Sequence, residues 1–297
     1  MVKFISELNS TVNDFVWGLP MMVLILGVGI YLSVRCGFPQ FTHFGHIMKN
    51  TLGKAFEKKE KKEGSISPFK AMCTALAASI GTGNIAGVSG AIAIGGPGAV
   101  FWMWVSALLG MCTKFAEVTL AIKYRERNKE GDWVGGPMYY ITNGLGKGWK
   151  WLACLFAGFG ALAAFGIGNM TQINTIASTI NTAISKFVVT TESQQTIIAW
   201  VVAIICAIIC AIVLIGGIQR LADVCALLVP VMAVIYIVAS LVVIIANAGA
   251  LPTALAAILK GAFHPASVAG GLAGIGIKTA LTKGVGRGIF SNEAGLG

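Results

Sequence analysis

The fold of this chain is decided by the stretch Ile80-Gly81-Thr82-Gly83-Asn84-Ile85-Ala86-Gly87, in the middle of an apolar run from Phe69 to Ile92. The run is long enough to cross a hydrocarbon core of about 30 Å at a rise of about 1.5 Å per residue. Its weakest helix formers, two glycines, a threonine and an asparagine, stand at its centre. Because backbone groups released in lipid must find other partners, the stretch predicts a buried break at the membrane midplane. Such discontinuous helices hold substrates and ions in many secondary transporters.

The composition is that of a membrane protein with several spans. Of 297 residues, 56% are hydrophobic and 11% are charged, and the mean hydropathy is +0.80, which excludes a soluble globular domain. The 38 glycines lie among apolar residues, as expected for closely packed membrane helices. A net charge of +10 would suit a nucleic-acid-binding protein, but the cations gather in loops between apolar runs. We therefore expect no nucleic-acid partner.

The sequence shows no metal cluster and no pair of nucleophile and base at helical spacing, so we expect no enzyme and no cofactor. The seven cysteines lie in or beside apolar runs and are interpreted as free thiols. Cys206 and Cys210 are four residues apart and lack the spacing of a zinc site. His43 and His46 are more simply loop residues than metal ligands.

The apolar runs predict an all-α, polytopic membrane helix bundle. The expected spans are Phe15–Val34, Phe69–Ile92, Ala99–Ile122, a helix that begins near Trp151, Ile197–Ile215 and Leu221–Ala246. A short interfacial helix is expected from Gly136, and loops are expected at Lys260, His264 and Pro265.

The cations predict the orientation of these spans. Fifteen of them lie in the segments 35–70, 123–150 and at Arg220, whereas three lie in the segments that alternate with these. The positive-inside rule then places the N-terminus outside a cell membrane. The first span has neither the basic leader nor the cleavage site of a signal peptide, so we expect it to be retained.

The central stretch has two other interpretations. Its residues 81–86 match the dinucleotide pattern G-x-G-x-x-A, but no strand precedes them and no acidic residue follows about twenty positions later. Close helix packing is the stronger alternative, because Gly83 and Gly87, like Ala86 and Gly90, are four residues apart. Spacing alone leaves packing and a binding-site break both open.

Charged residues inside apolar segments are functional candidates by default. Lys114 and Glu117 are three residues apart, so they can pair, and we interpret them as a structural pair. Lys278, Lys283 and Arg287 would each cost about 2.5 to 3.5 kcal/mol at the centre of a lipid-facing helix. They indicate either an extracellular amphipathic helix or a watery vestibule.

The helix after Trp151 becomes polar in its outer part. Asn169, Gln172 and Thr179 fall on one face of an α-helix. We expect this face to point into the bundle. Its side chains either form hydrogen bonds between helices or line a substrate path.

The chain resembles the alanine or glycine:cation symporters, the sodium:alanine symporter family. The resemblance rests on the stretches 81–87, 95–110 and 287–297, of which the second, Gly95-Gly96-Pro97-Gly98-Ala99-Val100-Phe101-Trp102-Met103-Trp104-Val105-Ser106-Ala107-Leu108-Leu109-Gly110, resembles the family's signature pattern closely. It implies a leucine-transporter-like fold of two inverted repeats, and sodium-coupled symport of alanine or glycine by alternating access. Small neutral amino acids, sodium ions and the lipid bilayer are then the partners, with Na+ as the coupling ion.

The resemblance also implies a binding site. The unwound residues Gly81, Thr82, Gly83 and Asn84 would hold the carboxylate and amine of the substrate, and Thr82, Gly83 and Asn84 would offer carbonyls to sodium. The pocket would be completed by Gln172, Phe290, Ser291, Asn292 and Glu293.

The resemblance implies a division into residues 1–68 (an extra helix and a loop), 69–250 (the first five-helix repeat) and 251–297 (the start of the second repeat). Because the family continues through further repeat helices, we expect a truncated product that does not transport alone. The alternative is a membrane scaffold or channel-like subunit that needs a partner. The choice among alanine, glycine and serine, the choice between sodium and proton, and the oligomeric state stay open.

Overall fold

The computed structural model describes residues 2–55, 66–129, 131, 133–263 and 277–295, and these form two compact units. Unit 1 contains Met1–Phe44, Gly83–Phe156 and Ile244–Gly297, and unit 2 contains Gly45–Thr82 and Ala157–Val243. The chain therefore leaves one unit and enters the other between Thr82 and Gly83, inside the stretch that the sequence predicts to be broken.

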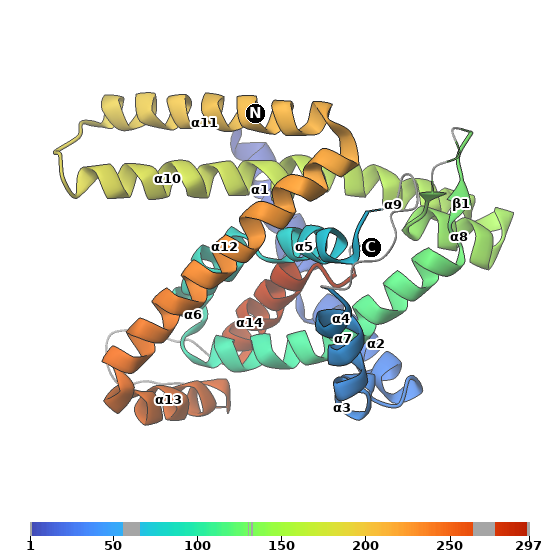
Figure 1. Ribbon diagram of the computed structural model, residues 1–297. Helices are drawn as coiled ribbons and strands as arrows, with labels where there is room; N and C mark the ends of the chain where they lie inside the picture. Colours follow the sequence, from blue (N-terminus) through green and yellow to red (C-terminus); the bar gives the residue numbers. More distant parts are fainter. Residues whose placement is uncertain (1, 56–65, 130, 132, 264–276, 296–297) are drawn as a thin grey trace. The chain divides into compact units, whose positions relative to one another are not determined.

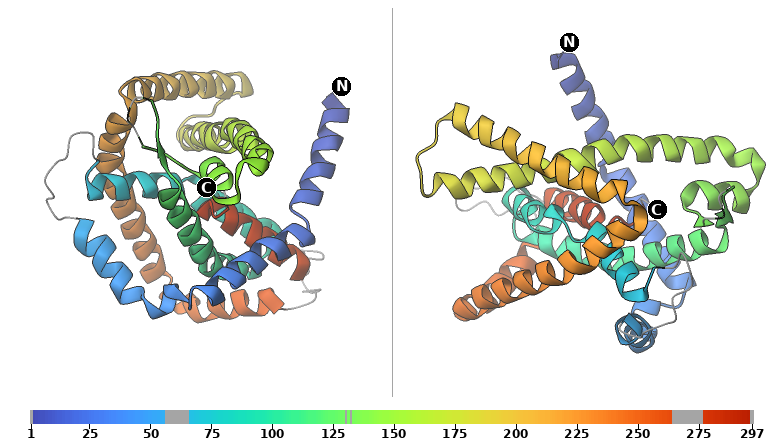
Figure 2. Two further views of the ribbon diagram at one scale, coloured as in Figure 1. Left: turned by 90° about the vertical axis from the view of Figure 1, so that its right-hand side faces the viewer. Right: turned by 45° about the horizontal axis from the view of Figure 1, so that its top comes forward.

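Unit 1 is built around α14 (Ile277–Asn292), which lies against α7 (Gly98–Lys123) and also contacts α6 (Ala86–Gly95) and α2 (Leu19–Arg35) (Figures 1 and 2). The same unit holds α1 (Val2–Val16), α3 (Pro39–Thr42), α8 (Pro137–Leu145), α13 (Leu251–Phe263) and a hairpin of β1 (Glu126–Arg127) and β2 (Trp133–Val134).

Small residues allow α14 to approach α7 closely. A Cβ atom built on Gly284 would lie 2.4 Å from the carbonyl oxygen of Ala99, and one on Gly288 would lie 2.9 Å from the Ser106 side chain. On another side of α14, Val285 and Ile289 are buried with Met22 of α2. The helix is thus packed inside unit 1, which explains how a segment of such low hydropathy is accommodated.

Unit 2 contains α5 (Pro68–Ser79) and a helical hairpin of α10 (Thr171–Ser185) and α11 (Glu192–Ile215), which lie side by side (Figure 1). Thr191 caps α11 in a reciprocal capping box with Gln194. The unit also holds most of α4 (Phe44–Ala55) and of α12 (Gly217–Ala246), and α9 (Lys150–Ala163) leads into it from unit 1.

Five helical segments among the described residues are long and apolar enough to cross a membrane, namely Ser6–Arg35, Gly98–Lys123, Lys147–Ser185, Glu192–Ile215 and Gly217–Ala246. A sixth is obtained if Pro68–Ser79 and Thr82–Gly95 together form one broken span. The expected spans are thereby confirmed by length and composition. On α11 the side chains of Ile205, Ile208 and Ile212 are exposed, as on a lipid-facing helix.

Loops were expected at Lys260, His264 and Pro265. Lys260 lies in α13 and not in a loop, because the alanine- and leucine-rich segment Leu251–Phe263 favours helix more strongly than its single cation opposes it. The expected loop at His264 and Pro265 and the start of the segment from Ala266 lie outside the described residues.

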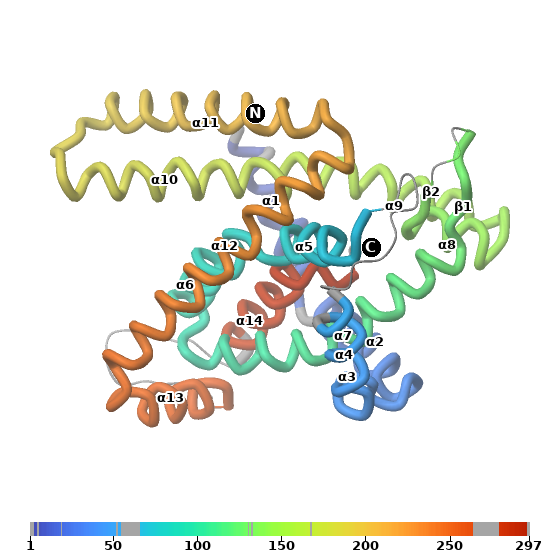
Figure 3. Tube along the Cα trace, in the orientation of Figure 1, coloured from blue at the N-terminus to red at the C-terminus, as the bar shows by residue number. Residues whose placement is uncertain are grey.

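The predicted break in the helix is confirmed (Figure 3). Helix α5 ends at Ser79, and the following Ile80 has extended backbone (φ −101°, ψ 94°). A single 3-10 turn, Thr82–Asn84, precedes Ile85, and α6 starts at Ala86. The low helix propensity of the glycines, threonine and asparagine accounts for an interruption at this point.

Candidate functional site

Gln172 bonds to one backbone group and one side chain at the break. In unit 2 its Oε1 atom accepts hydrogen bonds from the Thr82 backbone N–H at 3.3 Å and from the Thr82 hydroxyl at 2.7 Å. A Cβ atom built on Gly81 would lie 3.1 Å from Nε2 of the same carboxamide. The side chain of Gln172 therefore lies directly against the broken backbone at Gly81 and Thr82.

The polar face predicted around Gln172 is wrong at its two ends, since Asn169 and Thr179 are exposed. Asn169 lies in a π-helical segment, Ala164–Met170, which separates α9 from α10. Because a π-helix closes i→i+5 hydrogen bonds, the 3.6-residue period does not run through it. Thr179 donates to the Thr175 carbonyl at 2.7 Å, within its own helix.

In unit 1, Gly83 lies against Phe290 and Ser291. A Cβ atom on Gly83 would be 3.2 Å from Cδ1 of Phe290 and 3.4 Å from Oγ of Ser291. The Ser291 Oγ atom is buried and has no hydrogen-bond partner among the described residues. A buried hydroxyl without a partner costs free energy, so Ser291 is a candidate for hydrogen bonding to a ligand.

Asn292 and Glu293 have other neighbours in unit 1. Asn292 lines a small, partly open hollow in unit 1, together with polar Ser106 and Thr113 and apolar residues of α2, α7 and α14. Glu293 has a left-handed backbone (φ 51°) that ends α14, and its carbonyl accepts a hydrogen bond from Lys114 Nζ at 3.3 Å.

Lys114 and Glu117 form the expected pair, with 3.4 Å between Nζ and Oε2. Because Lys114 also bonds to Glu293, the pair connects α7 to the end of α14. Burial, followed by the charge of Glu117, raises the pKa of the Tyr140 phenol on α8.

Helix packing and the break both account for glycines in the central stretch. Gly83 and Gly87 each contact side chains of α14, whereas Gly90 has no atom within 4 Å of a Cβ position. The packing interpretation thus holds for the first pair of small residues and fails for Gly90.

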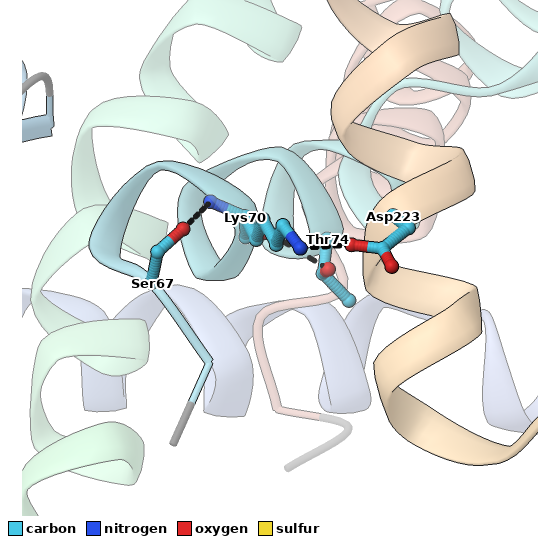
Figure 4. Close-up of polar contacts among 4 residues, drawn as sticks. All are labelled: Ser67, Lys70, Thr74 and Asp223. Atoms are coloured by element: carbon cyan, nitrogen blue, oxygen red, sulfur yellow. Dashed lines mark hydrogen bonds and ion pairs between the residues drawn. The ribbon is translucent and has the colours of Figure 1, made fainter. Parts of the chain in front are cut away.

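Asp223 on α12 has a charged partner that is distant in the sequence. In unit 2, Lys70 on α5 forms an ion pair with Asp223 on α12 (Figure 4). The Ser67 hydroxyl caps the N–H of Lys70, and the Thr74 hydroxyl donates to the Lys70 carbonyl at 2.8 Å. These contacts attach the first turn of α5 to α12.

For Arg287 the sequence left open an extracellular amphipathic helix or a watery vestibule, and it gave no contact with an aromatic ring. Its guanidinium carbon lies 4.9 Å from the centroid of the Phe290 ring. The i,i+3 spacing of the two residues was the signal that could have linked them.

Comparisons with known proteins give a consistent result. The model of the sodium:alanine symporter family matches residues 2–297. The sodium/alanine symporter AgcS of Methanococcus maripaludis is 48% identical over 301 residues, which cover 100% of this chain and 62% of that protein. An uncharacterized transporter of Haemophilus influenzae is 45% identical over 294 residues, 99% of this chain and 61% of the relative.

The probable sodium/glutamine symporter GlnT of Bacillus subtilis is 37% identical over 297 residues, 100% of this chain and 58% of that protein. The chain thus spans about three fifths of the length of these relatives. The expectation of an inactive, truncated product gains no support from these alignments, which extend over 99 to 100% of the chain.

Proposed function

Because this chain belongs to the sodium:alanine symporter family, we propose that it carries a small neutral amino acid across the cell membrane together with sodium, by alternating access. The observation that supports this most directly is the break itself. On the unit 2 side Gln172 holds Thr82, and on the unit 1 side Gly83 adjoins the unpartnered hydroxyl of Ser291.

The proposed substrate contacts follow from the chemistry of these groups. Backbone groups of Gly81 to Asn84 hold the amino acid, and the carbonyls of Thr82, Gly83 and Asn84 face the sodium ion that is carried with it. Ser291 and Phe290 are the wall from α14, because both adjoin Gly83. Asn292 and Glu293 contact the substrate only if the end of α14 changes its conformation. In the present structure Asn292 lines the hollow, and the Glu293 carbonyl accepts a hydrogen bond from Lys114.

The fold proposed for the chain is the leucine-transporter-like inverted repeat, with the N-terminus outside. The first repeat occupies residues 69–250 and the second begins after residue 250. The distribution of cations supports this orientation, and the six candidate spans supply enough helices for an extra N-terminal span and a five-helix repeat.

Alanine is the first substrate to test, because AgcS is named a sodium/alanine symporter, whereas the name of GlnT shows that a relative is assigned glutamine. The chain is reconstituted in liposomes, and uptake of labelled alanine is measured with an inward sodium gradient and with potassium in its place. We expect uptake that requires sodium and is competed by unlabelled alanine. Uptake without sodium refutes the coupling, and no uptake refutes transport by this chain.

A further inference from the structure

Arg287 is a cation of α14 with an aromatic neighbour, and within the described residues it forms no ion pair. Its Cζ atom lies 4.9 Å from the Phe290 ring centroid. The ion pairs Lys70–Asp223 and Lys114–Glu117 do not include it, and no hydrogen bond joins its guanidinium to another described residue. A half-buried guanidinium in this position keeps its N–H donors available for a ligand.

Gly87 provides the surface on which this guanidinium rests. Gly87 is the second residue of α6, and a Cβ atom built there would lie 2.6 Å from Nη1, 2.8 Å from Cζ and 2.9 Å from Nε of Arg287. No side chain fits between the helix and the guanidinium. The glycine therefore allows the charge to lie directly against the first turn of α6.

The first turn of α6 favours the same kind of ligand. Ile85 stands at the N-cap and supplies no side-chain hydrogen bond. The first N–H groups of a helix have no acceptor within it and carry partial positive charge. One turn earlier in the chain, Gly83 adjoins the buried, unpartnered hydroxyl of Ser291. Donors from the first turn of α6 and from Ser291 and Arg287 of α14 thus lie in unit 1, each beside the segment 83–87.

We propose that Arg287 binds the carboxylate of the transported amino acid and so selects zwitterions over analogues that lack a carboxylate. The inference rests on the proposed function and names a substrate-recognising residue for it. A guanidinium matches a carboxylate with two parallel N–H bonds, and such charge-assisted bonds are strengthened away from bulk water. Phe290 covers one face of the guanidinium, which leaves its N–H edges to bind the ligand.

The test is equilibrium binding by the purified chain in lipid nanodiscs with sodium present. Labelled alanine is displaced by unlabelled alanine or by alaninamide, which has the same side chain and no carboxylate. We expect the wild-type chain to prefer alanine. Arg287→Gln should weaken alanine binding by about 10- to 100-fold and remove the preference, because a hydrogen bond to a charged group is lost.

Three further variants make the test specific. Arg287→Lys keeps the positive charge but loses the planar guanidinium with its two parallel N–H donors. It should therefore retain part of the preference for alanine over alaninamide. Gly87→Ala displaces the guanidinium and keeps its charge, so it should also reduce the preference, and it serves if Arg287→Gln fails to fold. Lys283→Gln, at an exposed cation one turn earlier on α14, should leave both affinities unchanged.

The possible results separate the two proposals. A folded Arg287→Gln chain with the wild-type ratio of the two affinities overturns the role of Arg287 and leaves the proposed function standing. A wild-type chain that binds no alanine in sodium overturns both. If replacing chloride by gluconate weakens alanine binding by the wild type as much as Arg287→Gln does, the guanidinium holds an inorganic anion and the inference is wrong.

Discussion

Replacing Gln172 with alanine tests whether this carboxamide stabilises the break in the helix. The change removes the acceptor of two hydrogen bonds from Thr82, at 3.3 and 2.7 Å. Each neutral bond contributes about 0.5 to 1.5 kcal/mol net, so the pair is worth about 1 to 3 kcal/mol. That corresponds to about a 5- to 150-fold change in an equilibrium constant.

The assay is amide hydrogen exchange of peptides that cover residues 80–85, together with sodium-dependent alanine binding. We expect Gln172→Ala to speed exchange at Thr82 and to weaken binding within that range. Gln172→Glu keeps an oxygen acceptor and should restore slow exchange. Thr179→Ala changes an exposed residue of the same helix and is the matched control. Wild-type exchange and binding in Gln172→Ala would refute the stabilising role.

Other predictions concern single side chains elsewhere in the two units. Asn84→Ala should reduce sodium-dependent uptake and sodium affinity if the Asn84 side chain takes part in the ion site; unchanged values would limit its role to the backbone carbonyl, which the substitution keeps. The raised pKa of Tyr140 means that the folded chain holds the phenol proton more tightly than the unfolded chain, so stability should fall as the pH rises above about 10. Tyr140→Phe should flatten this part of the pH profile measured by thermal unfolding, and an identical slope would contradict the shift. Lys70→Ala should cost less than about 1 kcal/mol of stability and become neutral at high salt, because Lys70 and Asp223 are 41% and 55% exposed in their side chains. A larger loss that salt does not reduce would show that the pair is more than a surface contact.

Several features could be predicted from residues that are neighbours in the chain. The positions of the spans follow from hydropathy and length, and the break follows from four poor helix formers in an apolar run. The pairing of Lys114 with Glu117 follows from helical spacing. These properties depend on local backbone preference and on the free energy of transfer from water to lipid. Both can be predicted from the residue types in one segment.

Only the tertiary structure decided which distant side chains contact each half of the break. Gln172 reaches Thr82 across ninety residues of sequence, and the π-helical segment before it has no signal in the 3.6-residue period. The contact of Arg287 with Gly87 depends on how closely α14 and α6 pack. Ser291 adjoins Gly83 whereas its neighbour Asn292 lines the hollow, because the two residues lie on different sides of α14. Helical periodicity assigns residues to a face, but the partner of that face is set by the packing of whole helices. The central stretch thus determined by itself where the membrane helix breaks, whereas packing determined which side chains surround each half of the break.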